Sequence, residues 1–589
     1  MKHKSTYRRL LFNGLVCFLI STTAVAVHAQ VLPGNYSYPN NHLDWFTLEG
    51  DHFLIHYQNG NEKEATYSLL HAENVYAPIT QLYDHTPSKK VSIVLRDRTD
   101  YSNGAAYFFD DKIEIWLPPL NSPFRGSQVW LRNVITHEFA HIVQLGAAMK
   151  RSQTIPAIYL QWLSYEDVRR PDILYGYPKT IITHPFATVS IPAWFAEGTA
   201  QFQRDSIYYD FWDSHRDMML RTAVLSDRAL DLTEMGHFSS KTSREREMVY
   251  NQGFDFTSYL ANRFGESSLS DFTRESSKSR SGNFQVAMES TTGIRAESLY
   301  EDWMAAREKK YRRQISGVTE NKAELIEAEG FLNLFPQFGP DGKILGYLSN
   351  RGRDFAQTRL VLTSGDSTLT VRELGAGRIS EETQGLLTSI RSSSNIALDL
   401  VSTRFSFSPK GKQIVYSRRN KNKFGEQYND LYLYNISTGE TTQLTENARM
   451  HDPAWHPSEE LIAAIQFQNG THALNIFNIE SRKSKTIARL GPGETLYTPV
   501  WSPDGRSIYY SVAYSGKRKI YRIVVDSEVV EPILDSEHVD FRDPWIDPEN
   551  KHLYFSSDHR GIFNIYRKSM ESGEIQKLTD RIGGAFMPF

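Results

Sequence analysis

The stretch His137-Glu138-Phe139-Ala140-His141 decides how the first half of this 589-residue chain is interpreted. It has the form H-E-x-x-H and lies in a segment with apolar residues at helical spacing. Histidines at positions i and i+4 of a helix lie on one face, one turn apart. Their ring nitrogens can bind one Zn²⁺ at about 2.0–2.1 Å. Glu138 can reach a water beside the metal, so the arrangement suits hydrolysis of an amide bond.

The alternative to a metal site is a solvated helix face that carries two histidines by chance. An apolar stripe around the motif argues against this alternative, because it predicts a buried helix. Buried imidazole and carboxylate groups need partners, and a metal ion would supply them. The stripe consists of Val129, Leu131, Val134, Ile135, Phe139, Ile142, Val143 and Leu145.

A third ligand is expected in the segment Pro192-Ala193-Trp194-Phe195-Ala196-Glu197-Gly198. Proline suits the first turn of a helix, and Glu197 would project from that helix among apolar neighbours. An ordinary surface glutamate is the alternative, but the segment has little polar face to which such a residue would belong. His184 is a rival third ligand, since histidine is a common ligand of zinc.

The pair H-E-F-A-H and P-A-W-F-A-E-G resembles the gluzincin metallopeptidases, the thermolysin-like or peptidase MA-like group. The resemblance implies an α+β fold with His137, His141 and Glu197 as zinc ligands and Glu138 as general base. The separation between positions 141 and 197 is longer than in the best-known gluzincins. We expect the segment from Ala147 to Ser190, which is rich in aromatic residues and proline, to form an inserted lid or pocket wall.

Upstream segments fit the same fold. The runs at 53–57 and 91–95 are rich in β-branched and other apolar residues and predict strands. Residues 103–106, Asn-Gly-Ala-Ala, predict a turn. The segment 112–117 alternates apolar and charged residues and predicts a further strand just before the metal helix.

The segment 112–117 is the candidate strand for substrate binding. In gluzincins a strand in this place forms the sheet edge along which the peptide lies, and an edge can accept an extended peptide through main-chain hydrogen bonds. The resemblance therefore assigns Ile113 and Ile115 to substrate binding. The alternative is an ordinary edge strand that Lys112 and Glu114 protect from aggregation.

Downstream, residues 249–260 resemble the helix that closes a gluzincin domain. Members of that group usually place a tyrosine or histidine opposite the base, where it stabilises the tetrahedral oxyanion. The resemblance makes Tyr250 the first candidate for this role and His237 the second. The alternative for either residue is an ordinary core or surface position.

The N-terminus predicts an exported protein. Basic residues at 2, 4, 8 and 9 precede a mostly apolar stretch from Leu10 to Val27, and small residues allow cleavage before Gln30. We expect a Sec-type signal peptide at 1–29, with a periplasmic or secreted product and no membrane span after cleavage. An uncleaved anchor helix is the alternative, which the polar interruptions disfavour.

Composition excludes several classes of function. The only cysteine, Cys17, lies in the predicted signal peptide, so the mature chain has no thiol for catalysis, zinc binding or disulfides. The formal net charge of −3 gives no field that would attract nucleic acid. The length predicts two to four domains.

The second half of the chain repeats. Pro340, Pro409, Pro457, Pro503 and Pro548 each precede a short strand, and the later markers recur at intervals in the forties, which predicts a β-propeller. The motif x-P-x-W-S-P-D-G resembles the TolB-type propeller. We expect about five blades. The segment 585–589 resembles the opening of another unit, so we expect an incomplete propeller in a truncated chain, or else an open or partner-completed one.

The combined prediction is a multidomain protein. It has a signal peptide at 1–29, an α+β gluzincin-like domain at 30–317, a linker at 318–330 and an all-β TolB-like propeller at 331–589. The predicted function is zinc-dependent hydrolysis of peptide or protein substrates, with the propeller binding substrate or a protein partner. One alternative is a non-catalytic periplasmic scaffold whose function lies in the propeller. Another is hydrolysis of a non-peptide bond at the same zinc site.

Overall fold

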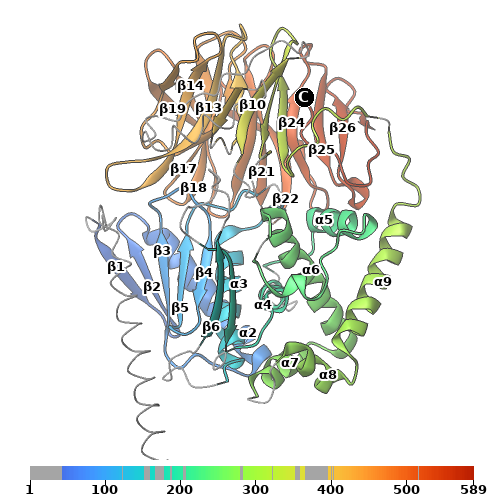
Figure 1. Ribbon diagram of the computed structural model, residues 1–589. Coiled ribbons are helices and arrows are strands. Elements are labelled where there is room, and N and C mark those ends of the chain that lie inside the picture. Colours follow the sequence, from blue (N-terminus) through green and yellow to red (C-terminus); the bar gives the residue numbers. More distant parts are fainter. Residues whose placement is uncertain are drawn as a thin grey trace, which may run out of the picture. The chain divides into compact units, whose positions relative to one another are not determined.

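The computed structural model describes most of the chain (Figure 1). The described residues are 43–122, 124–150, 159–165, 178–185, 189–202, 207, 209–239, 241–278, 283–321, 323–351, 358–364, 396–399, 401, 403–514 and 516–589. The predicted signal peptide, most of the predicted lid and the side chain of His184 lie outside this description and stay predictions. No helix in the described ranges is long and apolar enough to cross a membrane.

A mixed five-stranded sheet opens the described chain, with the order β1-β2-β3-β5-β4. The three inner strands run parallel to one another, and both outer strands are antiparallel to their neighbours. The strands are β1 (Trp45–Glu49), β2 (Phe53–Gln58), β3 (Val91–Arg96), β4 (Gly104–Tyr107) and β5 (Lys112–Trp116).

Two of the sequence predictions for this sheet are wrong. Residues 103–106 are not a turn, because Gly104–Tyr107 forms β4 and pairs with β5. The segment 112–117 is therefore not the edge, and Ile113 and Ile115 are fully buried in the core rather than available to a substrate. Gly104 serves close packing: a Cβ on this residue would lie 2.5 Å from Oε1 of Glu138.

Helices cover the sheet and build the rest of the first half. Phe139 of α3 (Trp130–Ala147) is fully buried and packs edge to face on Phe53 of β2, with ring centroids 5.0 Å apart, as the apolar stripe predicts. A two-stranded antiparallel hairpin, β6 (Tyr159–Tyr165) and β7 (Pro178–Pro185), follows α3. The helices are α2 (Glu62–Tyr83), α3 (Trp130–Ala147), α4 (Ala193–Gln201), α5 (Ser214–Leu225), the 3₁₀ turn η1 (Glu234–Gly236), α6 (Ser243–Phe264), α7 (Ser267–Ser277), α8 (Phe284–Thr292) and α9 (Ala296–Gln314).

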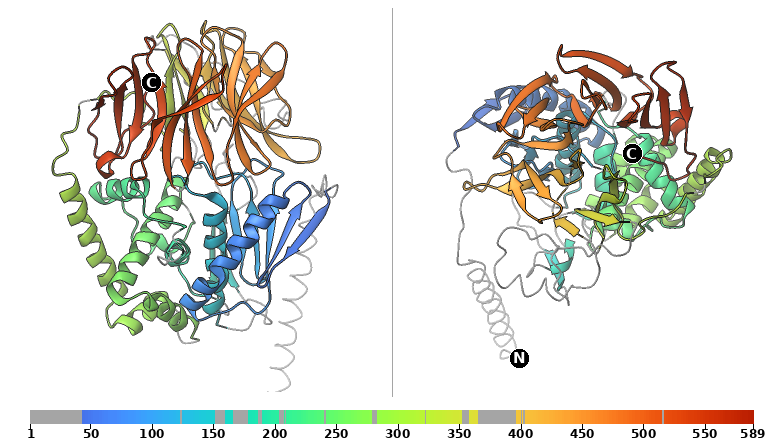
Figure 2. Two further views of the ribbon diagram at one scale, coloured as in Figure 1. Left: turned by 180° about the vertical axis from the view of Figure 1, so that it is seen from behind. Right: turned by 90° about the horizontal axis from the view of Figure 1, so that it is seen from above.

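Five four-stranded antiparallel sheets form the second half, which confirms a propeller of five blades after the α/β region. Figure 2 shows the sheets following one another around a common centre. The first two blades contain β8 (Asn333–Phe338), β9 (Ile344–Ser349), β10 (Arg359–Ser364) and β11 (Ile396–Asp399), then β12 (Ser406–Phe407), β13 (Gln413–Lys421), β14 (Gln427–Asn435) and β15 (Thr441–Gln443). The third contains β16 (Met450–Trp455), β17 (Leu461–Gln468), β18 (Thr471–Asn478) and β19 (Lys483–Arg489). The last two contain β20 (Thr495–Trp501), β21 (Ser507–Tyr514), β22 (Lys517–Val524) and β23 (Val529–Leu534), then β24 (Phe541–Ile546), β25 (His552–Ser557), the 3₁₀ turn η3 (His559–Gly561), β26 (Asn564–Ser569) and β27 (Ile575–Lys577).

The repeated residue-proline pair has a backbone role. The residue before proline has a left-handed φ in three successive blades, 49° at Asp452, 46° at Thr498 and 55° at Asp543. The pairing register of the first strand shifts at each of these positions. A bulge of this kind bends the strand and increases its twist. Met587 has the same left-handed φ and its N–H donates to Oγ of Ser556 at 3.0 Å, so the unit-like opening predicted there has the local geometry of the other units.

The cap of α6 can be tested, because this helix carries residues of the candidate site. Oγ1 of Thr242 accepts from the N–H of Glu245, whose carboxylate accepts from the N–H of Thr242, forming a capping box. We expect Thr242→Ala to lower the free energy of unfolding by about 1 kcal/mol. Arg295→Ala is the matched control, because Arg295 precedes α9 without a side-chain cap bond. Urea unfolding measures both variants, and equal midpoints for them would contradict the assignment.

Candidate metal centre

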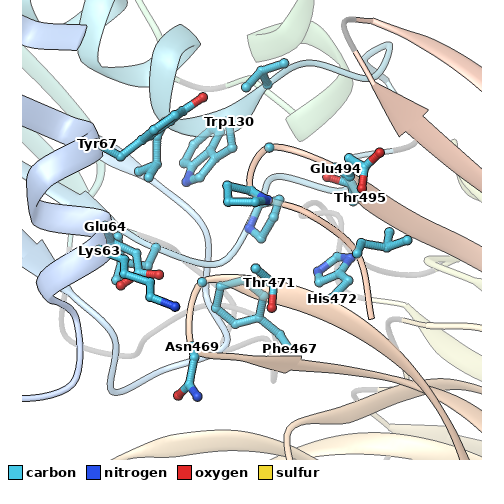
Figure 3. Close-up of a pocket in the computed structure, with 18 of the residues that line it drawn as sticks. Lys63, Glu64, Tyr67, Trp130, Phe467, Asn469, Thr471, His472, Glu494 and Thr495 are labelled. Carbon is cyan, nitrogen blue, oxygen red and sulfur yellow. The ribbon is translucent and has the colours of Figure 1, made fainter. Parts of the chain in front are cut away.

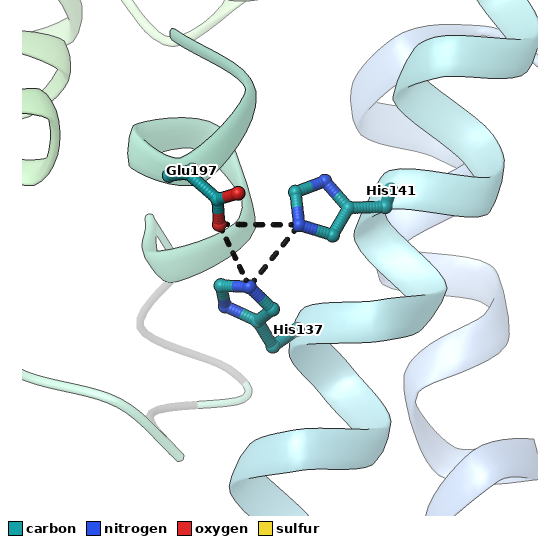
Figure 4. Close-up of side chains that lie close together, drawn as sticks. All are labelled: His137, His141 and Glu197. Carbon is teal, nitrogen blue, oxygen red and sulfur yellow. Dashed lines mark hydrogen bonds and ion pairs between the residues drawn. The ribbon is translucent and has the colours of Figure 1, made fainter. Parts of the chain in front are cut away.

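The two histidines of the motif converge because α3 places them one turn apart on one face (Figure 4). Their Nε2 atoms lie 3.1 Å apart, and their rings meet edge to face with centroids 4.7 Å apart. Both side chains are mostly buried, with 14% of His137 and 10% of His141 exposed. α3 therefore presents two imidazole nitrogens to one point inside the protein.

Glu197 brings a carboxylate to the same point from α4. Its Oε2 lies 3.1 Å from Nε2 of His137 and 3.3 Å from Nε2 of His141 (Figure 4). Tetrahedral zinc with bonds of about 2.0–2.1 Å keeps its ligand atoms about 3.3–3.4 Å apart. The three atoms thus have the mutual spacing that one small divalent ion requires, and this group could hold a metal.

A contact between two glycines fixes where α4 lies. A Cβ on Gly198 would lie 2.3 Å from the carbonyl oxygen of Gly253 in α6, and a Cβ on Gly253 would lie 2.3 Å from the carbonyl oxygen of Trp194 in α4. The two helix backbones are therefore in direct contact, with the hydroxyl of Thr257 packed beside Gly198. Because Glu197 adjoins Gly198, this contact sets the depth at which its carboxylate enters the site.

The electrostatics of the cluster favour a positive charge beside the carboxylate. Burial raises the pKa of Glu197, but His141 and His137 outweigh burial and hold that pKa far below its usual range. Burial lowers the pKa of His141, but the nearby Glu197 outweighs burial and raises it. A divalent cation would supply the same stabilising charge without protonation of the histidines.

Glu138 lies beside the cluster and faces the edge strand. It is 7% exposed, and burial raises its pKa, against the opposing effect of His137 and His141. A hydrogen bond from the backbone of Ala106 in β4 also lowers this pKa. A buried carboxylate with a raised pKa is suited to accept a proton near neutral pH.

Tyr250 of α6 reaches the same site. The centroid of its ring lies 6.3 Å from that of the His137 ring. The guanidinium of Arg125 lies over the Tyr250 ring, 4.7 Å from its centroid. Burial, with Glu197 next, raises the pKa of Tyr250 well above its usual value, so its hydroxyl stays a donor at neutral pH. Arg125 in turn pairs with Glu247 at 2.8 Å.

His237, the second candidate for the oxyanion role, adjoins Phe238, whose ring centroid lies 5.6 Å from that of Tyr250. It is exposed, and burial together with Lys241 lowers its pKa, with Glu234 and Asp231 as the opposing carboxylates. No group of the metal cluster is among these influences. The buried ring contact between Tyr250 and His137 favours Tyr250 over His237. Arg125 and the edge strand β4 were missed by the sequence analysis, since neither stands in a motif.

One large cavity in the described part of the chain lies outside the metal site. It has a volume of about 530 Å³, and Tyr67, Trp130 and Phe467 are among the aromatic residues in its wall (Figure 3). His472 is the single histidine in the wall, and burial lowers its pKa to about 3. The ring of His451 lies beside that of His472, with centroids 5.9 Å apart. In the described residues, however, the group of three ligands that could hold one ion is His137, His141 and Glu197, so the candidate metal centre is the α3–α4 cluster.

Comparison with known proteins identifies the propeller alone. The family model for the TolB beta propeller domain matches residues 446–586. An uncharacterized protein of Agrobacterium fabrum is 27% identical over 186 residues, which are 30% of this chain and 61% of that protein. Dipeptidyl-peptidase 5 of Porphyromonas gingivalis is 23% identical over 188 residues, 30% of this chain and 27% of that enzyme. Among solved structures, TolB from Acinetobacter baumannii is similar with a TM-score of 0.29 and 13% identity, covering 49% of this chain and 60% of that one.

The propeller is thus TolB-like and distantly related to propellers of peptidases. The matched part spans less than two thirds of each of these relatives. The identities are too low to carry an activity across from them. What this chain does has to be argued from its own residues.

The glycine contact gives a direct test of the site. Gly198→Ala would force α4 away from α6, and such overpacking costs about 1–3 kcal/mol. Because Glu197 moves with α4, we expect the affinity for Zn²⁺ to fall by about 10- to 100-fold, the range seen when groups that orient ligands are changed. Titration against a chromogenic chelator measures the affinity. Gly317→Ala is the control, since a Cβ there meets nothing within 4 Å, and equal affinity in both variants would contradict the assignment.

Proposed function

We propose that this protein is an exported zinc-dependent metallopeptidase of the gluzincin kind. One observation carries the proposal: two imidazole nitrogens and one carboxylate oxygen from separate helices lie within 3.3 Å of one another, with the buried Glu138 beside them. The chain itself supplies the full set of ligands and base that peptide hydrolysis at a metal requires. Export rests on the N-terminal sequence.

His137, His141 and Glu197 would hold the zinc ion, and zinc bound there would polarise the scissile carbonyl and lower the pKa of water toward about 7. Glu138 would accept the proton of the attacking water and pass it to the leaving amine. The raised pKa of Glu138 supports the first step, because a stronger base accepts the proton more readily. One carboxylate thus acts first as base and then as acid.

Tyr250 would stabilise the negative charge that develops on the carbonyl oxygen. Its pKa is raised well above the usual value, so it keeps the proton that a hydrogen bond to an oxyanion needs. Arg125, which lies over the ring and pairs with Glu247, holds the tyrosine in place. A donor placed in advance in a water-poor site stabilises such charge strongly.

The edge strand β4 would bind the peptide. β4 pairs with β5 on one side and has no other neighbour in the sheet among the described strands. Its residues Gly104 and Ala106 lie against Glu138, so an extended peptide paired to its free edge would pass the base. Addition of a strand to an exposed edge is a common way of binding peptides. The small side chains of Gly104, Ala105 and Ala106 leave this edge accessible.

The base can be tested separately from the metal. We expect Glu138→Gln to keep about one zinc per chain while its peptide hydrolysis falls by about 10²- to 10⁴-fold, because the amide cannot accept the proton. Elemental analysis and a peptide-library digestion on the same samples measure both properties. Glu289→Gln, an exposed change on α8, is the control. Unchanged hydrolysis with zinc bound would refute the mechanism, and a zinc-loaded wild type that cuts no peptide would favour the scaffold function.

Removal of the hydroxyl of Tyr250 tests the second role. Loss of one oxyanion donor typically costs about 10²- to 10³-fold in kcat, and we expect Tyr250→Phe to lower kcat in this range with little change in KM. Tyr259→Phe on the same helix is the control, because the Tyr259 hydroxyl accepts from Arg263 at the surface. Steady-state kinetics on one cleaved peptide measure both variants. A Tyr250→Phe enzyme with the kcat of the control would remove Tyr250 from the mechanism.

A further inference from the structure

The loop that leads from β3 into the edge strand β4 is held by the propeller. Asp44–Asn422 and Glu426–Phe589, which contain both elements, form one compact unit. The N–H of Asp100 donates to the carbonyl of Gln427 at 2.8 Å, and the N–H of Gln427 donates to the carbonyl of Arg98 at 3.2 Å. Thr99 and Gln427 thereby form a parallel bridge. The loop thus pairs with the start of β14 in the second blade.

One arginine of the propeller neutralises two carboxylates of this loop. Nε of Arg449 lies 2.7 Å from Oδ1 of Asp100, and its Nη1 lies 2.8 Å from Oδ1 of Asp97. The guanidinium also lies over the rings of Phe467 and Tyr428, at 4.8 and 5.1 Å from their centroids. Only 12% of Arg449 and 5% of Asp100 is exposed. Removal of the arginine would leave buried carboxylates without a cation, which is strongly unfavourable.

The propeller presents Arg449 on a rigid connection between β15 and β16. The buried carboxylate of Asp430 accepts from the N–H groups of Asn447 and Ala448, at 3.0 and 2.9 Å, and from the hydroxyl of Thr445 at 2.9 Å. Arg449 itself has a left-handed φ of 55°. This fixed backbone gives Arg449 little freedom to follow the loop if the loop moves. The propeller is therefore the fixed side of the contact.

The held loop continues directly into the strand beside Glu138. Gly104 begins β4 four positions after Asp100, a span of at most about 14 Å of extended chain. β4 has four residues and, in the part of the chain that the structure describes, one neighbouring strand, so it has little stability of its own. Gly104 packs tightly against the base, because even a Cβ on this residue would lie 2.5 Å from Oε1 of Glu138. A small shift of the loop would thus move the edge relative to the base.

We propose that the propeller positions the substrate edge of the peptidase half, with Arg449 as the positioning residue. The clamp of Arg449 on Asp97 and Asp100 holds the loop, and the loop holds β4 at the distance from Glu138 that an extended peptide needs. This role rests on the proposed function, because it assigns β4 to peptide binding. It gives the propeller a part in substrate binding without contact between a blade and the peptide.

A purely structural clamp would behave differently from a positioning clamp. If Arg449 served only to join the two halves, its loss would lower overall stability and leave β4 as well ordered as β3 below the unfolding transition. A positioning clamp predicts a local effect, confined to the loop and β4. Hydrogen exchange of backbone amides separates the two, because it reports local opening segment by segment.

The experiment compares the full zinc-loaded chain with Arg449→Met, Arg449→Lys and the exposed control Arg506→Met, all well below their melting temperatures. We expect amides of 97–107 to exchange about ten-fold faster in Arg449→Met, with residues 91–96 of β3 unchanged. The KM for an extended peptide should rise about ten-fold, with metal content and kcat retained, the pattern expected when uniform binding is lost. Arg449→Lys should recover part of both effects, and Arg506→Met should match the wild type.

Two outcomes would overturn the inference. The first is wild-type exchange of 97–107 in a folded Arg449→Met protein. The second is faster exchange over all segments alike in both Arg449→Met and Arg449→Lys, which would assign the clamp to joining the halves alone. If Arg449→Met does not fold, Arg449→Lys, which keeps the charge but loses the fork geometry, decides by the same local comparison. A wild type that cuts no peptide would remove the proposed function, whereas the exchange data would still report whether the propeller holds β4.

Discussion

The backbone contact between α4 and α6 is the constraint on which the candidate site depends. Gly198 and Gly253 let the backbones of the two helices come into direct contact. Glu197 adjoins one of these glycines, and Tyr250 lies one turn before the other on α6. A single contact therefore fixes the third ligand and the expected oxyanion donor relative to each other. A site built on helix backbones in this way is held more precisely than one carried by loops.

The cluster itself is unfavourable unless it holds positive charge. Two ring nitrogens and a carboxylate oxygen lie within 3.3 Å of one another in a mostly buried place. Either a protonated His141 or a metal ion can supply the positive charge that the Glu197 carboxylate needs. The raised pKa of His141 reflects the first of these. Only the metal leaves both imidazoles neutral and the carboxylate fully ionised. Metal binding and the stability of this part of the fold should therefore be coupled.

Local patterns in the sequence were enough for the parts of the site that lie on one helix. The i, i+4 spacing and the apolar stripe predicted α3, and the P-A-W-F-A-E-G run predicted the helix of Glu197. The prediction was wrong at 103–106, because Gly-Ala-Ala has neither the alternation nor the β-branched residues of a typical strand. β4 forms there through pairing with β5 and packing on Glu138. Its place at the edge then follows from the sheet order, which no local pattern contains.

Long-range pairs set the limit of what the sequence could reveal. Arg449 bonds to Asp97 and Asp100 across 352 and 349 positions, and each of these residues alone resembles an ordinary surface charge. The structure gives a local sign of the role of Arg449: a non-glycine residue with a left-handed φ, in a connection where Asn447 has one as well. Such backbone persists only where its surroundings over-determine it. On the propeller side, the carboxylate of Asp430 holds this backbone, and on the side of the first half, Asp97 and Asp100 bind the arginine. The connection between β15 and β16 therefore lies where the two halves of the chain constrain each other.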